Sequence, residues 1–259
     1  QRCGVERVYG SAEEMIGSES LDAIVASQPF DRHGVLLPEV LRAGKPVFIE
    51  KPLSSTPDSG RAVRDAVRAS GTWLMVGYHK RSDPACAYAL DHVRTLRDSR
   101  ELGKLTYIRI LMPAGDWVAG GFTDLVNLGD PPPSLAREPL VSDMDLETQK
   151  AYTSFVNYYI HQVNLVRFFL EEPYRVTYAD PSGVMLVGES ESGIPCVIEM
   201  SPYHTSIEWQ ESVLLCFERG YVKVELPAPL ATHRPGRVEI MRDPEHAATP
   251  ETMSPHLPW

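Results

Sequence analysis

The sequence lacks several features that would mark particular classes of protein. It has no run of about 18 apolar residues, and its first thirty positions show no basic start followed by an apolar stretch, so neither a membrane span nor a secretory signal is predicted. We therefore expect no membrane partner and a cytoplasmic location. No two cysteines have C-x-x-C spacing, so we predict no bound metal and reduced, structural thiols at Cys3, Cys86, Cys196 and Cys216.

Basic residues are too few and too scattered for a nucleic-acid surface. The chain has 25 Lys and Arg against 35 Asp and Glu, a formal charge of -10, which would repel a phosphate backbone. We predict that nucleic acid is not a partner. Hydrophobic residues make up 43% and charged residues 23% of the 259 residues, which excludes a disordered, collagen-like or disulfide-stapled chain and fits one large or two modest domains.

The first third of the chain alternates between short apolar runs and helical patterns. The apolar runs are short, rich in β-branched residues and bounded by Gly or Pro, which is typical of buried strands. Strands are predicted at residues 21–28, 47–50 and 72–78, and helices at residues 34–43 and 55–70. A strand, helix, strand, helix, strand order predicts a parallel, doubly wound α/β sheet of the Rossmann-like type.

Beyond residue 84 the pattern changes to α+β. We predict helices at 85–95 and 148–170, and about thirty Gly- and Pro-rich residues ending near position 141, which suggest a lid or binding loop. Strand-like runs joined by short turns predict a largely antiparallel sheet. These runs cover residues 105–112, 175–178, 183–189, 196–202, 212–218, 221–225 and 237–241. The expected domains are residues 1–84, a dinucleotide-binding type, and residues 85–259.

The predicted helix at 148–170 is unusual because residues 151–166 include no Asp, Glu, Lys or Arg. A solvated helix face normally carries charge, so we expect burial on nearly every side. Ser154, Asn157, His161 and Asn164 fall within about 80 degrees of one another at 100 degrees per residue. This polar row faces either an internal hydrogen-bond network around a core histidine or a cavity that admits a polar ligand.

Four segments together resemble the Gfo/Idh/MocA family of nicotinamide-dependent sugar and polyol oxidoreductases. They read DAIVASQPFDRH, AGKPVFIEKPLS, MVGYHKRSDPA and IHQVN. The most specific piece is the tripeptide Glu50-Lys51-Pro52 at the end of a predicted strand. The resemblance implies NAD or NADP as cofactor and a small sugar-like substrate. It also implies a homodimer or homotetramer formed through the C-terminal sheet, although the apolar alternation of that sheet equally fits a face covered by its own helices.

The resemblance assigns roles to residues that the predicted topology brings to one edge of the parallel sheet. Gln28, Glu50, Lys51 and Tyr78 stand at or just past the carboxyl ends of parallel strands, where ligands bind in such sheets. The cofactor-binding residues that it implies are Gln28, Pro29, His33, Glu50, Lys51, Pro52, Arg81 and Trp117. For His33, a partly exposed loop position is the alternative, and Arg81 is equally suited to bracing the domain junction. Trp117 is equally suited to anchoring its loop.

His161 and Lys51 are the implied catalytic pair. Imidazole titrates near neutrality and takes the proton of a hydroxyl as its carbon gives up hydride, while an ammonium stabilises the developing alkoxide. Asn157, Asn164 and Tyr78 are the implied substrate-binding residues. Relatives often carry Asp at the positions of Asn157 and Gln162, so an NAD-using glycosidase or dehydratase, or a non-catalytic ligand-binding member, stays an alternative.

The phosphate-binding turn typical of the family is not found in this sequence. The family opens with a strand, a G-x-G-x-x-G turn and a helix, and no G-x-G-x-x-G occurs here. We expect that about 30 or more residues of that first unit, and the helices that usually close the second domain, belong to a longer protein of which this sequence is a part. The alternative is a truncated protein that cannot hold a dinucleotide in the usual way. NAD and NADP are not distinguished, because the discriminating residue belongs to that unit.

Overall fold

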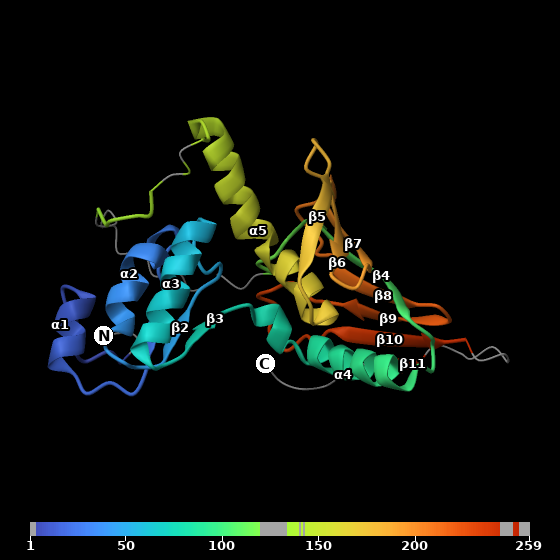
Figure 1. The fold of residues 1–259 in the computed structure, drawn as a ribbon, viewed down its shortest axis with the longest axis horizontal. Coiled ribbons are helices and arrows are strands. Elements are labelled where there is room, and N and C mark those ends of the chain that lie inside the picture. Colours follow the sequence, from blue (N-terminus) through green and yellow to red (C-terminus); the bar gives the residue numbers. More distant parts are fainter. Residues whose placement is uncertain (1–3, 120–133, 140, 142, 244–250, 254–259) are drawn as a thin grey trace. The chain divides into compact units, whose positions relative to one another are not determined.

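A computed structural model describes residues 4–119, 134–139, 141, 143–243 and 251–253. The chain divides into two compact units (Figure 1). The first, here called the N-terminal unit, comprises Gln1–Tyr78 and Asp130–Ile160, and the second, the C-terminal unit, comprises His79–Gly129 and His161–Trp259. The two domains expected at residues 1–84 and 85–259 stay a prediction, because a compact unit is not by itself an independently folding domain.

A three-stranded parallel sheet forms the centre of the N-terminal unit. Its strands are β1 (Ile24–Ala26), β2 (Val47–Ile49) and β3 (Leu74–Val76), in the order β1-β2-β3. Its helices include α1 (Ala12–Ser18), α2 (His33–Leu41) and α3 (Pro57–Ser70), with a short 3-10 turn η1 (Phe30–Arg32) before α2. Residues 146–160 of helix α5 (Leu146–Leu170) also belong to this unit. The predicted Rossmann-like strand and helix order is confirmed, while α1 was not expected from the sequence.

Local sequence signals explain where the helices begin and end. The Thr56 hydroxyl accepts a hydrogen bond from the backbone N–H of Ser59 at the start of α3, and Ser11 does the same for Glu14 at the start of α1. Gly71 ends α3 with a φ of 66 degrees, a left-handed conformation that costs glycine little. These caps satisfy backbone groups that the first and last helical turns leave without a partner.

One apolar cluster holds this unit together. Strands β1 and β2 contribute alternate side chains, and α2 and α3 cover them (Figure 1). The buried members are Ile24, Ala26, Leu37, Val40, Leu41, Val47, Ile49 and Val63. The side chains that alternate with them point away from this cluster, and Val25 is 71% exposed. The cluster therefore fixes the orientation of β1 and β2, and with it the direction of the loops that follow these strands.

The C-terminal unit is built on a mixed sheet of eight strands in the order β11-β10-β9-β8-β4-β7-β6-β5. Among the strands that the structure describes, only the β4–β7 pair of this sheet is parallel, so the predicted largely antiparallel sheet is confirmed. The strands are β4 (Leu105–Ala114), β5 (Tyr174–Ala179), β6 (Met185–Ser190), β7 (Pro195–His204), β8 (Ser212–Phe217), β9 (Gly220–Glu225), β10 (Arg237–Arg242) and β11 (Glu251–Met253). The 3-10 turn η2 (His79–Ser82) and helix α4 (Pro84–Ser99) precede them.

Helix α5 (Leu146–Leu170) confirms the predicted long helix, but its burial differs from the expectation. His161, Gln162, Leu165 and Phe169 are buried, whereas Ser154, Asn157 and other residues of its first half are exposed. The expected burial on nearly every side is therefore wrong for the first half. Uncharged polar side chains are well hydrated, so a lack of charge does not by itself require burial.

Three further sequence expectations concern the cysteines, the membrane and the Gly-rich loop. Cys86, Cys196 and Cys216 are free thiols, and burial raises the pKa of Cys196 to about 11, which keeps it protonated and unreactive. Cys3 lies outside the described residues, as do positions 120–133 of the Gly-rich loop. In the part of the chain that the structure describes, no helix is long and apolar enough to cross a membrane.

We expect the N-terminal unit to depend on Leu41, which is fully buried in the cluster on α2. Leu41→Ala should lower the free energy of unfolding by about 2–5 kcal/mol, because it removes buried methyl groups and leaves a cavity. Val35→Ala, on the same helix at a side chain that is 44% exposed, should change it by less than about 0.5 kcal/mol. Urea unfolding followed by circular dichroism measures both, and equal losses would contradict the cluster's role.

Candidate active site

The carboxyl ends of β1 and β2 place three predicted site residues along one edge of the parallel sheet. Gln28 follows β1 by two positions, and Glu50 and Lys51 follow β2 directly. The backbone N–H of Glu50 reaches the carbonyl of Ala26 at 3.5 Å, so the two strand ends stay side by side. Because parallel strands end at the same edge, an amide, a carboxylate and an ammonium group are gathered there.

The ammonium group of Lys51 is directed at helix α5. Its Nζ lies 2.6 Å from the backbone carbonyl oxygen of Asn157 and 3.1 Å from Oδ1 of the same residue. Lys51 and Asn157 belong to the same unit. His161, the predicted acid/base, comes one helical turn after Asn157 along α5. Asn157 therefore binds the lysine here, in addition to the substrate-binding role predicted for it.

His33 joins the two loops that follow β1 and β2. Its ring is fully buried, with Nδ1 3.0 Å from the carbonyl of Pro52 and Nε2 3.2 Å from the carbonyl of Gln28. Of the two readings of this residue, the exposed loop histidine is wrong, because both ring nitrogens meet backbone carbonyls. The Gln28 side chain in turn accepts a hydrogen bond from Arg32. Pro52 is buried and Pro29 is exposed, and the cofactor contacts predicted for these residues stay predictions.

Glu138 holds a third segment against the same loops, and the sequence analysis did not identify it. Its carboxylate accepts hydrogen bonds from the backbone N–H of Gly34 at 2.7 Å and of Ser55 at 3.0 Å, and the residue is 7% exposed. A Cβ at Gly34 would lie 2.9 Å from this carboxyl group, so only glycine fits. Glu138 and Gly34 are 104 positions apart in the sequence, so no local pattern could reveal the pairing.

In the C-terminal unit, His161 is 8% exposed and lies against a second histidine. The ring centroids of His79 and His161 are 4.4 Å apart, at an interplanar angle of 69 degrees. His79 is a candidate that the sequence analysis missed, although it directly follows Tyr78 in the MVGYHK motif. The next residue on α5, Gln162, is fully buried and donates from Nε2 to Oε1 of Glu211 at 2.6 Å.

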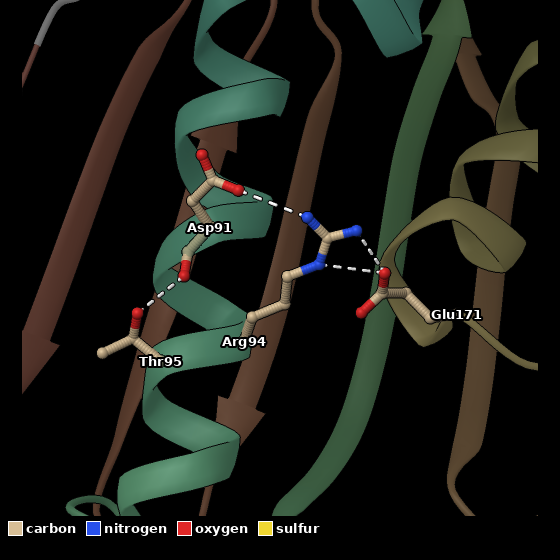
Figure 2. A network of polar contacts seen from close by, with 4 residues as sticks. All are labelled: Asp91, Arg94, Thr95 and Glu171. Carbon is tan, nitrogen blue, oxygen red and sulfur yellow. Dashed lines mark hydrogen bonds and ion pairs between the residues drawn. The ribbon is translucent and has the colours of Figure 1, made fainter.

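Asn164 lines a cavity of about 460 Å³ in the C-terminal unit, together with Arg81, Arg94 and Phe168. Among the described residues, its buried Oδ1 has no hydrogen-bond partner. The Arg81 guanidinium lies 5.0 Å from the centroid of the Phe168 ring. Figure 2 shows that Arg94, on α4, is held by Asp91 and by Glu171 at the end of α5, with Nε 2.9 Å from Oε1 of Glu171. His161 is not among the residues that line this cavity.

The remaining predicted residues lie on loops. Trp117 is 42% exposed, and its backbone carbonyl accepts a hydrogen bond from the N–H of Leu230 at 3.3 Å. Tyr78 is half-buried just after β3. Their contacts with cofactor and substrate stay predictions. Within the described ranges, no group of three or more His, Cys, Asp or Glu side chains is placed to hold a metal ion.

The fold and the strand-end residues define a Rossmann-type chain with an attached mixed sheet. Residues 1–78 match the family model described as "Oxidoreductase family, NAD-binding Rossmann fold". This match confirms, over residues 1–78, the resemblance to the Gfo/Idh/MocA family that the motifs carry.

Three known proteins show how far the similarity extends. The scyllo-inositol 2-dehydrogenase (NAD(+)) of Bacillus subtilis is 29% identical over 106 residues, which are 41% of this chain and 30% of that protein. The inositol 2-dehydrogenase of Corynebacterium glutamicum is 25% identical over 240 residues, 90% of this chain and 64% of that protein. An apo structure of levoglucosan dehydrogenase, at 15% identity, superposes with a TM-score of 0.69 over 99% of this chain and 67% of that one.

The chain thus spans less than two thirds of the length of both curated relatives. At its low identity, the levoglucosan dehydrogenase structure shows the fold alone.

We expect Glu138→Gln to loosen the loops after β1 and β2. An amide keeps one acceptor oxygen but turns an NH₂ group toward a backbone N–H donor, so one buried hydrogen bond is lost at a cost of about 1–3 kcal/mol. Thermal unfolding of this variant should therefore begin at a lower temperature. Glu147→Gln, at an exposed position on α5, is the matched control, and an equal effect of both changes would contradict the role of Glu138.

Proposed function

We propose that this protein is an NAD(P)-dependent oxidoreductase that acts on a hydroxyl or carbonyl group of a sugar, polyol or related small molecule. The observation that carries the proposal is the ammonium group of Lys51, which follows a parallel strand of the family's cofactor-binding fold. It bonds to Asn157 of α5, within the N-terminal unit. A cation at a strand end and a buried base, here His161, are the two groups that alcohol oxidation needs.

In the proposed reaction, His161 removes the proton of the substrate hydroxyl as the C–H bond of the same carbon gives up its hydride. Lys51 stabilises the negative charge that develops on the oxygen. In the reverse direction, His161 returns the proton to the new hydroxyl. The nicotinamide ring supplies the hydride acceptor or donor when the cofactor is bound. His79 lies against the His161 ring and restricts its orientation.

The donor set at the strand ends fits a nicotinamide nucleotide. Glu50 is an exposed carboxylate, which suits ribose hydroxyls, and Lys51 donates hydrogen bonds of the kind that a carboxamide or alkoxide oxygen accepts. His33 and Glu138 hold the two loops that carry Pro29 and Pro52, and so set the shape of this edge. We assign the outer cofactor contacts to Arg81 and Trp117 as part of the same proposal.

For the substrate, we propose a polyhydroxylated ring. The orphaned Oδ1 of Asn164 and the amide of Asn157 suit hydroxyl groups, because a hydroxyl both donates and accepts. Tyr78 is assigned to the same role. The dehydrogenases that resemble this chain are named for inositol and levoglucosan, and both names describe compounds of this class.

We also propose a homodimer or homotetramer formed through the C-terminal sheet. One face of that sheet is buried within its own unit, while the other carries half-buried side chains such as Leu111 and Leu214. Light scattering after gel filtration tests this proposal, and a monomer at all concentrations would contradict it.

Turnover should depend on both Lys51 and His161. In the purified protein, assayed with NAD⁺ or NADP⁺ against a panel of polyols and sugars, Lys51→Met and His161→Asn should each lower kcat by about 10²–10⁴-fold. The dissociation constant of the cofactor should change far less, because the proposed roles are in the chemical step. Absorbance of the reduced nicotinamide and fluorescence titration measure the two quantities.

Lys150→Met is the matched control, since Lys150 is exposed on the same helix as His161. It should leave kcat unchanged within about twofold. Unchanged turnover in Lys51→Met or His161→Asn removes that residue from the mechanism. If the unaltered protein reduces neither cofactor with any member of the panel, the proposed function itself is contradicted.

A further inference from the structure

We infer that a buried ion pair between Lys80 and Glu211 acts through Gln162 to position the imidazole of His161. The inference rests on the proposed function only for the chemical role of His161. The contacts themselves lie wholly within the C-terminal unit. Lys80, Glu211 and Gln162 are therefore positioning residues rather than catalytic ones.

The three side chains form a connected chain of polar contacts inside the unit. Gln162 donates from Nε2 to Oε1 of Glu211 at 2.6 Å, and the other carboxylate oxygen of Glu211 pairs with Nζ of Lys80. The side chains of Lys80 and Glu211 are 5% and 0% exposed, and Gln162 is fully buried. The Lys80 ammonium also lies 5.3 Å from the centroid of the Trp209 ring, so the cation is enclosed by an anion and an aromatic face.

The position of these contacts along the chain links them to His161. His79 and Lys80 are consecutive in η2, and His161 and Gln162 are consecutive in α5. The rings of His79 and His161 pack against each other with centroids 4.4 Å apart. Glu211 bridges the residues that follow them, Lys80 and Gln162. These two neighbouring contacts fix the position of this turn of α5 along the helix axis, and its rotation about that axis, relative to η2. The orientation of the His161 ring follows from that rotation.

The charge balance of the cluster explains why an amide stands at position 162. Lys80 is its cation, whereas Glu211 and the nearby Asp83 are both carboxyl groups, and Asp83 is 3% exposed. Burial raises the pKa of Asp83, Lys80 lowers it and Glu211 raises it further. A carboxylate at position 162 would add another negative charge 2.6 Å from Glu211. Glutamine instead supplies a neutral donor to the carboxylate.

Gln162→Glu tests the charge balance with almost no change of shape. We expect the melting temperature to fall by roughly 10 °C at about pH 8, because two carboxylates then face each other in the interior. The loss should shrink toward about pH 5. The introduced carboxyl has a raised pKa in the folded state, so its cost grows as the pH rises above the pKa of the unfolded chain.

The exchanged pair Q162E/E211Q is the decisive variant, because it restores one carboxylate and one amide. We expect it to recover at least about half of the melting temperature lost in Gln162→Glu, and so to show coupling in a double-mutant cycle. Met112→Leu is the matched control, since it removes the sulfur that Gln162 also contacts, at 2.7 Å, without altering charge. It should shift the melting temperature by no more than about 3 °C.

A readout on the histidine separates positioning from general stability. In ¹⁵N-histidine NMR spectra, Gln162→Leu should shift the ring signals of His79 and His161 relative to the unaltered protein. In Q162E/E211Q, the same signals should lie closer to those of the unaltered protein. For active protein, kcat should fall roughly 10-fold in Gln162→Leu, with KM changed by no more than about twofold.

Two results would overturn the inference: unchanged His161 signals in Gln162→Leu, or an exchanged pair no more stable than the sum of its single changes. Failure of the proposed function is recognised separately. It leaves the unaltered protein without turnover, whereas the melting temperatures and the histidine signals stay measurable.

Discussion

Two groups of polar contacts, one in each unit, depend on the regular geometry of helix α5. In the N-terminal unit, Asn157 receives the ammonium of Lys51, and in the C-terminal unit, His161 packs against His79. Side chains three or four residues apart on a helix lie on the same face. Each of these positions is therefore held by the hydrogen-bonded turns of its own part of the helix.

The loops after β1 and β2 need a different kind of support, because loops have no ladder of their own. His33 supplies it by meeting the carbonyls of Gln28 and Pro52, and Glu138 by accepting the N–H groups of Gly34 and Ser55. The N–H groups of Gly34 and Ser55 each gain a buried acceptor, and a ring N–H of His33 donates to one of the two carbonyls, so burial does not leave these polar groups unpaired. The buried contacts of His33 and Glu138 thus hold in place the sheet edge that carries Glu50 and Lys51.

Short-range patterns predicted most of the fold. Apolar runs bounded by Gly and Pro located β1 to β3, and helical periodicity located α5, because both signals are local. The strand-end rule then brought Gln28, Glu50 and Lys51 to one edge. Glu138, Glu211 and His79 were missed because their partners are distant in sequence or carry no pattern. The exposure of Ser154 and Asn157 was missed because uncharged polar residues suit water and interior alike.

Asn157 and Gln162 each bond to a charged partner, which the residue types at these two positions do not reveal. In the sequence, both positions look like the loss of a carboxylate beside His161. In the structure they use opposite ends of the same functional group: Oδ1 of Asn157 accepts from the Lys51 ammonium, while the nitrogen of Gln162 donates to the Glu211 carboxylate. An amide does both, whereas a carboxylate only accepts. At position 162 the negative charge is therefore carried by Glu211, the partner of the amide, whereas the partner of Asn157 is a cation.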